Sequence, residues 1–124
     1  MRFKPIIAGV ASALCICAAV PALAGQCGYD KCWGAVGFGP GGAWGWASGK
    51  PSQQAAISTV QRNCRGNCTQ IKTFYNTCGV IAAGNMNGWG WGYSQSRAQA
   101  EKIALGFCRR NDTGCRVRAW ACSF

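Results

Sequence analysis

The sequence lacks histidine and has very few acidic residues. Among 124 residues there is no His, and the only carboxylate side chains are Asp30, Glu101 and Asp112. General acid–base catalysis usually relies on these residue types. Ser-His-Asp and Cys-His catalytic groups, and zinc sites with histidine ligands, all need the missing residue. We therefore expect a protein that is not an enzyme, with no catalytic residues, no metal site and no cofactor.

Structural roles are sufficient for the acidic residues in the second half of the chain. Glu101 follows Arg97 at the spacing of one helical turn, so the two side chains can pair. Asp112 belongs to the turn-like sequence Asn111-Asp112-Thr113-Gly114. The positions of the three acids do not indicate the carboxylate pair of a glycosidase.

The sequence also lacks a long hydrophobic run outside its N-terminus. Arg2 and Lys4 precede an apolar run over 6–20, which is short for a membrane span. The sequence Ala22-Leu23-Ala24 then fits the small-x-small rule of signal-peptide cleavage. We predict a signal peptide over 1–24 and a single cysteine-rich domain over 25–124, periplasmic or secreted, with no transmembrane segment in the mature chain. The alternative is an uncleaved membrane anchor.

Cysteine, by contrast, is abundant. The chain has 10 cysteines, of which eight follow the predicted cleavage site. An even number in a short exported chain is typical of a disulfide framework. The closest pair, Cys64 and Cys68, does not form the C-x-x-C spacing of redox and zinc sites. Because a domain of this size buries a limited core, disulfides would contribute much of its stability.

An internal repeat organises the rest of the chain. Trp44-Gly45-Trp46 recurs as Trp89-Gly90-Trp91, a shift of 45 positions, and cysteines and strand residues recur at similar shifts. Phe74, for example, aligns with Trp120. The repeat predicts an α+β fold of two β-β-α-β units, about 32–77 and 78–124. We expect the units to form an antiparallel sheet with two helices against it.

The expected elements follow from apolar patterns and turn residues. In the first unit we predict strands over 33–38, 43–48 and 70–75, and a helix that begins with Pro51 in its first turn and ends near 63. In the second unit we predict strands over 79–83, 89–93 and 115–121, and a helix capped by Ser96 that ends near 109.

This layout suggests a disulfide pairing. Cys64–Cys68 and Cys108–Cys115 would each tie the end of a helix to the next strand. Cys78–Cys122 would close the two units against each other, because the two residues hold the same place in each. Cys27–Cys32 would then form a local loop. Eight cysteines allow 105 connectivities, so the assignment rests on symmetry alone.

Several of these motifs together resemble a known family. They are Trp44-Gly45-Trp46, Pro51-Ser52, Cys64, Cys68, Phe74, Asn76, Cys78-Gly79, Trp89-Gly90-Trp91-Gly92, Arg97-Ala98-Gln99-Ala100-Glu101, Cys108, Cys115-Arg116-Val117 and Trp120-Ala121-Cys122-Ser123. The pattern is similar to the bacterial domain of unknown function 4189 over nearly the whole mature chain. The resemblance implies an export signal and a six-cysteine core, to which Cys27 and Cys32 are an addition that supports their pairing with each other. It implies no catalytic residues.

The tryptophan strands allow two interpretations. Side chains alternate across a strand, so Trp44 and Trp46 share one face, and Trp89 and Trp91 share the corresponding face in the second unit. The opposite faces carry glycine and alanine, which let another element approach closely. The tryptophans then either form core or expose a platform that stacks on sugar rings or nucleobases.

Basic residues accompany aromatic ones on the third strand of each unit. We expect Arg116, Arg118 and Trp120 to point to one side, and Lys72 and Phe74 to hold the equivalent places in the first unit. With the four tryptophans above, these residues form the candidate ligand surface. An anionic envelope polymer would suit it. The alternative is a solvated surface without a specific ligand.

The function predicted from the sequence is therefore binding. After the predicted cleavage the chain would carry 11 basic and three acidic side chains, a net charge of +8. We expect an exported, non-catalytic interaction module whose partner is unknown, with an anionic envelope polymer or another protein as candidates; a nucleic acid is a poor candidate for an exported protein. The alternatives are a secreted effector or inhibitor that acts on another protein, and a purely structural envelope protein.

Overall fold

The computed structural model describes residues 25–124, and the predicted signal peptide lies outside them. The first half of this part forms a three-stranded antiparallel sheet, sheet A, in the order β2-β1-β3. Its elements are β1 (Trp33–Gly39), a short 3-10 turn (Pro40–Gly42), β2 (Ala43–Lys50), α1 (Gln53–Asn63) and β3 (Gln70–Tyr75). Each lies within two residues of the range predicted from the sequence.

The second half forms another three-stranded antiparallel sheet, sheet B, in the order β5-β4-β6. Its elements are β4 (Thr77–Ala83), β5 (Trp89–Ser94), α2 (Arg97–Asn111) and β6 (Arg116–Ser123). The prediction of an antiparallel sheet with two helices was wrong in the number of sheets. Each third strand pairs with the first strand of its own half, β3 with β1 and β6 with β4, so the backbone pairing between strands stays within each half.

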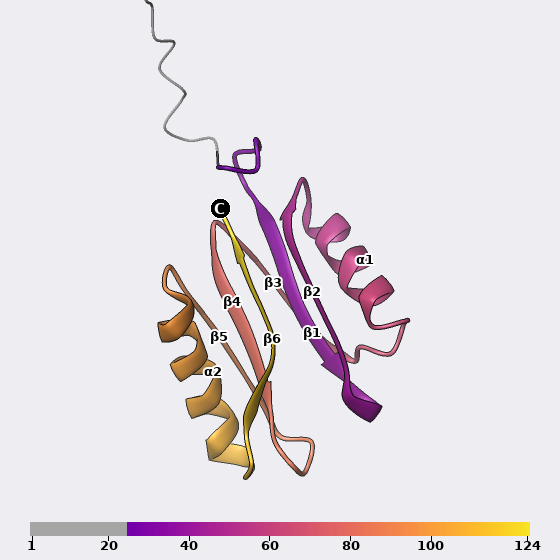
Figure 1. Cartoon of the computed structure of the whole chain (residues 1–124), viewed down its shortest axis with the longest axis vertical. Helices are drawn as coiled ribbons and strands as arrows, with labels where there is room; N and C mark the ends of the chain where they lie inside the picture. The colour runs from indigo at the N-terminus through magenta and orange to yellow at the C-terminus, as the bar shows by residue number, and fades with distance from the viewer. Residues whose placement is uncertain (1–24) are drawn as a thin grey trace, which may run out of the picture.

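The two sheets pack face to face, and each helix covers an outer face (Figure 1). Val36 of sheet A and Ile81 of sheet B meet in the cluster between the sheets, and both are fully buried. Val60 of α1 packs on sheet A, and Ala104 of α2 packs on sheet B. The order of layers is α1, sheet A, sheet B, α2.

Glycines on the outer faces allow the helices to lie close to the strands. A Cβ atom at Gly45 would lie 2.7 Å from the carbonyl oxygen of Val60 in α1. A Cβ at Gly90 would overlap the carbonyl oxygen of Ala104 and come within 2.5 Å of the backbone nitrogen of Cys108 in α2. Each W-G-W strand therefore turns its small residues toward a helix and its tryptophans toward the opposite sheet.

Serine side chains begin both helices. The hydroxyl of Ser52 accepts a hydrogen bond from the Ala55 backbone N–H at 3.1 Å, and that of Ser96 accepts one from the Gln99 N–H at 3.3 Å. Each satisfies a backbone donor that the first turn leaves unpaired. The N-cap predicted at Ser96 is therefore confirmed. Pro51, in contrast, lies just before the N-cap and outside the helix, because Ser52 takes the capping position.

Four disulfides join the cysteines in the pairing suggested by the sequence: Cys27–Cys32, Cys64–Cys68, Cys78–Cys122 and Cys108–Cys115. The expectation that Cys78–Cys122 closes the two units against each other was wrong. Cys78 lies in β4 directly opposite Cys122 in β6, so this bond joins two strands of sheet B. No disulfide of the described residues links sheet A to sheet B.

Ser123 provides a polar connection between the sheets. It lies near the end of β6, it is 1% exposed, and its hydroxyl donates to the carbonyl of Cys32 at 2.8 Å. The same oxygen accepts the Gly49 backbone N–H at 2.9 Å. Along the chain, the sheets are joined only by Asn76, the single residue between β3 and β4, which adopts a left-handed backbone with φ of 54°. Within residues 25–124, no helix is long and apolar enough to cross a membrane.

The contact between α2 and β5 makes a prediction about stability. We expect Gly90→Val to lower the free energy of unfolding by about 1–3 kcal/mol or more, because the new side chain meets helix backbone rather than a movable side chain. Gly106→Ala is the matched control, since a Cβ at this α2 position meets nothing within 4 Å. That change should stabilise the helix by up to about 1 kcal/mol. Urea unfolding of the disulfide-bonded protein measures both; a neutral Gly90→Val would contradict the close packing.

Candidate ligand-binding site

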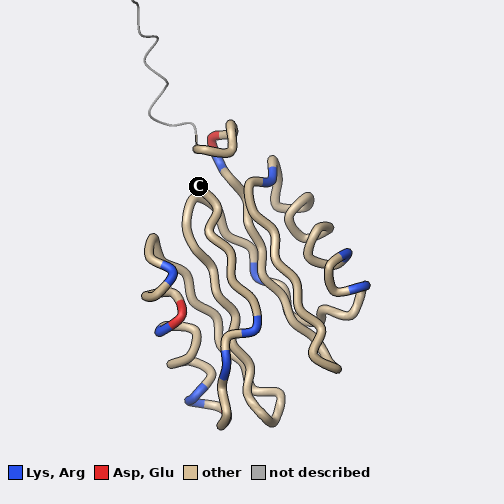
Figure 2. Tube along the Cα trace, in the orientation of Figure 1, with Lys and Arg blue, Asp and Glu red and all other residues tan. Residues whose placement is uncertain are grey.

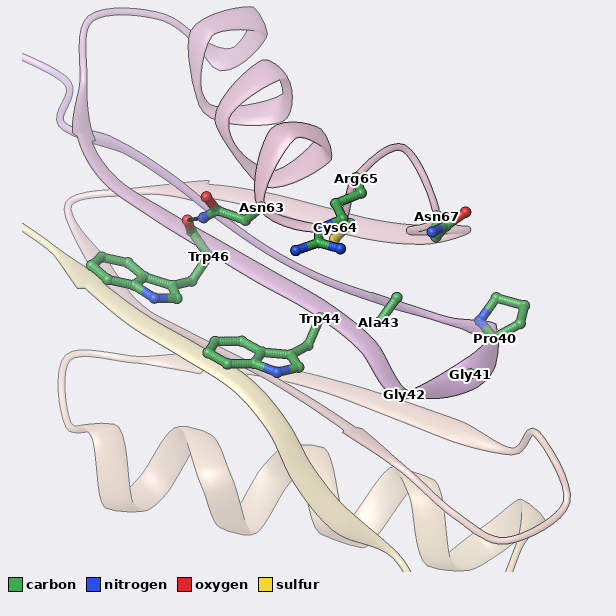
Figure 3. Close-up of a pocket in the computed structure, with 10 residues that line it drawn as sticks. All are labelled: Pro40, Gly41, Gly42, Ala43, Trp44, Trp46, Asn63, Cys64, Arg65 and Asn67. Atoms are coloured by element: carbon green, nitrogen blue, oxygen red, sulfur yellow. Dashed lines mark hydrogen bonds between the residues drawn. The ribbon is translucent and has the colours of Figure 1, made fainter.

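Two tryptophans of β2 are the centre of an exposed aromatic surface at the edge of sheet A. Trp44 and Trp46 are 54% and 46% exposed. Both rings lie beside β6 and point away from α1, as Figure 3 shows. Their exposure has a simple cause: β2 is an edge strand of sheet A, so the opposing sheet covers only part of each ring. The platform interpretation of the W-G-W motif therefore fits these two residues.

A groove of about 740 Å³ separates these rings from β6 and the beginning of α2. We call it the β2–β6 groove; it is lined by Trp44, Trp46, Arg97, Glu101, Val117, Arg118, Ala119, Trp120, Ala121 and Cys122. Trp120 is 41% exposed, and the guanidinium carbon of Arg97 lies 3.5 Å from the centroid of its ring. Three partly exposed indole rings and two arginines thus surround one space.

The arginines of this groove keep donors available. Arg97 donates from Nε to Oε1 of Glu101 at 2.9 Å, in an exposed ion pair that contributes little to stability. Its terminal guanidinium nitrogens make no hydrogen bond to a described residue, and neither does the side chain of Arg118. Both can therefore donate to an anionic group that enters the groove.

A second groove lies on the other side of the same tryptophans. It measures about 730 Å³ and runs between the β1–β2 turn and the residues that follow α1; Figure 3 shows its lining. Asn63 at the end of α1 donates from Nδ2 to the carbonyl of Trp46 at 2.8 Å and so holds the strand against the helix. Arg65 adds a third cation. Trp44 and Trp46 line both grooves and form the ridge between them.

The structure divides the predicted ligand surface between two edges of the molecule. Trp44, Trp46, Arg118 and Trp120 line the β2–β6 groove. The other members meet where β3 lies against β5: Lys72 is 5.1 Å from the Trp89 ring centroid, and the rings of Phe74 and Trp91 are 5.8 Å apart. Arg116 is exposed at the start of β6 and lines neither groove beside Trp44.

Simple alternation fails along β6. The register with β4 shifts between Ile81 and Ala82, so that Val117 packs toward α2 whereas Ala119 lies between the sheets. The extra residue breaks the two-residue period, so the expected common side is wrong for Arg116 and Trp120, which pair with opposite faces of β4. Arg118 and Trp120 nevertheless both line the β2–β6 groove.

The same irregularity corrects the alignment of Phe74 with Trp120. Phe74 pairs with Gly34 and is buried between the sheets. Trp120 pairs with Val80, a residue on the α2 side of sheet B, and it remains partly exposed beside Arg97.

Sequence reasoning did not assign Arg97, Glu101 or Arg65 to the ligand surface. Arg97 was interpreted only as the helical partner of Glu101, a contact that the structure does contain. The position of Arg97 in the first turn of a helix that follows a W-G-W strand could have indicated its place in the groove. That turn lies beside β6, the edge strand of sheet B.

The carboxylate of Asp112, like that of Glu101, has structural contacts. The Asp112 carboxylate accepts backbone hydrogen bonds from Met86 at 2.7 Å, Gly88 at 2.8 Å and Thr113 at 2.6 Å, and so ties the end of α2 to the β4–β5 turn. Desolvation raises the pKa of Asp112, but these three N–H donors outweigh it and hold the pKa below its ordinary value. Within residues 25–124, no group of three His, Cys, Asp or Glu residues could hold a metal ion.

Basic residues are spread along both helices and both sheets, as Figure 2 shows, with few acidic residues among them. The β2–β6 groove is distinguished by the combination of its two cations with exposed indole rings and not by a concentration of charge.

Comparison with known proteins places this arrangement in a family. The family model described as "Domain of unknown function (DUF4189)" matches residues 33–122. Among solved structures, the chain is similar to the NMR structure of Rv1813c from Mycobacterium tuberculosis, with a TM-score of 0.55 and 27% sequence identity. The similarity covers 73% of this chain and 74% of that one. No curated protein matches the chain.

The Asp112 contacts predict a pH dependence of stability. Because its pKa is lower in the folded state, Asp112 stabilises the fold fully above its unfolded-state pKa, and this contribution is lost as the pH falls through the folded-state pKa. We expect Asp112→Asn to reduce the urea midpoint at about pH 6 and to differ less from the unchanged protein at about pH 2. Equal differences at both pH values would contradict the role of the charge.

Proposed function

The chain belongs to the DUF4189 family, and we propose that it is an exported, non-catalytic module that binds an acidic glycan in the β2–β6 groove. The observation that carries the proposal is the convergence of Trp44, Trp46 and Trp120 with Arg97 and Arg118 around one open space.

Each component of the groove suits a different part of such a ligand. An indole ring offers an apolar face to the C–H surface of a pyranose ring. A guanidinium donates two parallel hydrogen bonds to a carboxylate and matches its planar shape. Trp44 and Trp46 are two residues apart on an extended strand, about 7 Å, so consecutive sugar rings can lie along the ridge.

Stacking favours a glycan over a lipid headgroup or a simple anion. A phosphate or sulfate ion would use only Arg97 and Arg118 and would leave the rings in water. A polymer that alternates apolar ring faces with carboxylates uses both kinds of side chain. The excess of basic over acidic residues in the chain adds long-range attraction to any anionic polymer.

Export is supported by the cysteine pairing and by the N-terminal sequence. Disulfides persist in oxidising compartments such as the periplasm and the cell exterior, and all eight cysteines after residue 24 are paired. The apolar run and Ala22-Leu23-Ala24 fit a cleavable signal peptide.

A binding role without catalysis agrees with the chemistry of the groove. Its only acid is Glu101, which pairs with Arg97, and the sequence offers no histidine as a base. We further propose that the two halves are copies of one β-β-α-β unit. The equal sheet orders, the serine-capped helices and the two W-G-W strands support this duplication.

Titration with a galacturonate hexamer, followed by calorimetry, tests the proposed function. We expect Arg118→Gln to weaken binding about tenfold, because it removes a charge-assisted hydrogen bond. The Trp44→Ala, Trp46→Ala double variant should weaken it further through lost stacking. Trp44 and Trp46 are exposed and Arg118 is half-buried at the groove, so near-ultraviolet circular dichroism should show that the fold is retained.

Arg109→Gln is the matched control for charge. Arg109 is exposed on α2, outside the groove, and its replacement changes the net charge by the same amount as Arg118→Gln. A specific site predicts near-normal binding by Arg109→Gln at about 0.15 M salt. Equal losses in the two arginine variants would instead mean nonspecific attraction, and the proposal would be rejected.

A further inference from the structure

We propose that a second groove, at the opposite edge of the paired sheets, binds an uncharged oligosaccharide. The groove lies where β3, the other edge strand of sheet A, meets β5, the other edge strand of sheet B. Its volume is about 590 Å³, within the range of small-molecule sites. We call it the β3–β5 groove; it is lined by Trp33, Gln53, Thr73, Phe74, Tyr75, Asn76, Thr77, Trp91, Tyr93 and Gln95.

Aromatic pairs form two walls of this groove. On sheet A, the rings of Trp33 and Tyr75 are 5.0 Å apart in an edge-on arrangement. On sheet B, the rings of Trp91 and Tyr93 are 5.7 Å apart. Tyr75 and Tyr93 are 46% and 61% exposed, so their rings are open to a ligand. Such rings combine an apolar face with a hydroxyl at the tip, a combination that suits both the C–H face and the hydroxyls of a sugar.

Two amide side chains are already held in place beside these walls. Gln53 donates from Nε2 to the hydroxyl of Thr73 at 2.8 Å, and Gln95 donates from Nε2 to the carbonyl of Asn76 at 2.8 Å. Neither Oε1 atom accepts a hydrogen bond from a described residue. Each amide therefore presents a fixed acceptor to sugar hydroxyls, and little side-chain freedom is lost on binding.

The charge of the lining determines the kind of ligand. All ten lining residues are uncharged, although the described residues include 11 basic side chains. Lys31 lies outside the lining and contacts one of its rings, with Nζ 5.0 Å from the ring centroid of Tyr75. An acidic ligand would find no partner within the lining, and a purely apolar ligand would leave the amide oxygens unpaired. A neutral saccharide uses both the rings and the amides.

The two grooves are independent sites on one module. They share no lining residue, and they lie at opposite edges of both sheets. A polymer that carries both acidic and neutral sugars could engage the two edges together, which would raise its overall affinity above that of either site. The neutral site does not depend on the proposed function of the β2–β6 groove.

Nuclear magnetic resonance titration of the disulfide-bonded protein tests the neutral site. The probes are cellotriose, maltotriose and N-acetylchitotriose, each added up to about 10 mM, a concentration that would detect millimolar binding. We expect at least one to shift the side-chain amide signals of Gln53 and Gln95 and the indole N–H signal of Trp91. The indole signals of Trp44 and Trp46 should stay in place. Absence of shifts with all three probes, or shifts only at Trp44 and Trp46, would overturn the proposal.

Variants separate this site from the acidic one. Tyr93→Ala should weaken neutral binding about fivefold to tenfold through the loss of one stacking face. Tyr29→Ala is the matched control, because Tyr29 is also exposed and lies outside the lining. Affinity should be the same at about 0.05 M and about 0.5 M salt, since the ligand carries no charge.

The Trp44→Ala, Trp46→Ala double variant should bind the neutral probe normally. This result would hold even if the acidic-glycan proposal failed. Equal weakening by Tyr93→Ala and Tyr29→Ala would reject the neutral site alone.

Discussion

The close contact of each helix with a glycine-bearing strand determines how the aromatic residues are placed. Gly45 and Gly90 occupy positions where a Cβ atom would meet helix backbone, so the helices lie directly on β2 and β5. Because side chains alternate along a strand, the tryptophans on either side of each glycine must then point toward the opposite sheet. At the edges of the sheets that opposite layer is incomplete, and the indole rings remain partly in water. Close packing on one face thus generates the binding surface on the other.

The disulfides reinforce each half of the molecule but not the contact between the halves. Cys64–Cys68 and Cys108–Cys115 fix the chain as it leaves each helix, and Cys78–Cys122 joins two strands of sheet B. The contact between the sheets depends instead on Val36, Ile81 and the aromatic residues around them. The hydroxyl of Ser123, which bridges the carbonyl of Cys32 and the backbone N–H of Gly49 in β2, adds a directional contact to this apolar one.

Local features of the structure could be predicted from the sequence, whereas its layers could not. Ser96 signalled a helix start, because that signal acts through the nearest backbone atoms. The same strand patterns are compatible with one sheet or two, since alternation defines faces and not partners. The irregularity at Arg118 carries no glycine or proline to mark it. The contact between Arg97 and Trp120 exists only because α2 lies across sheet B, and a sequence pattern does not contain that information.

The single residue between β3 and β4 has a consequence for cooperativity. Asn76 is the only backbone link between the sheets, and no disulfide of residues 25–124 crosses from one to the other. The disulfides therefore restrict the conformations of each unfolded half, but they do not restrict the distance between the two halves. Loss of the apolar contact around Ile81 would leave two separately stapled folding units, joined by a hinge. In such a protein the halves of two molecules can exchange partners while every disulfide stays intact, which is the geometric requirement for domain swapping.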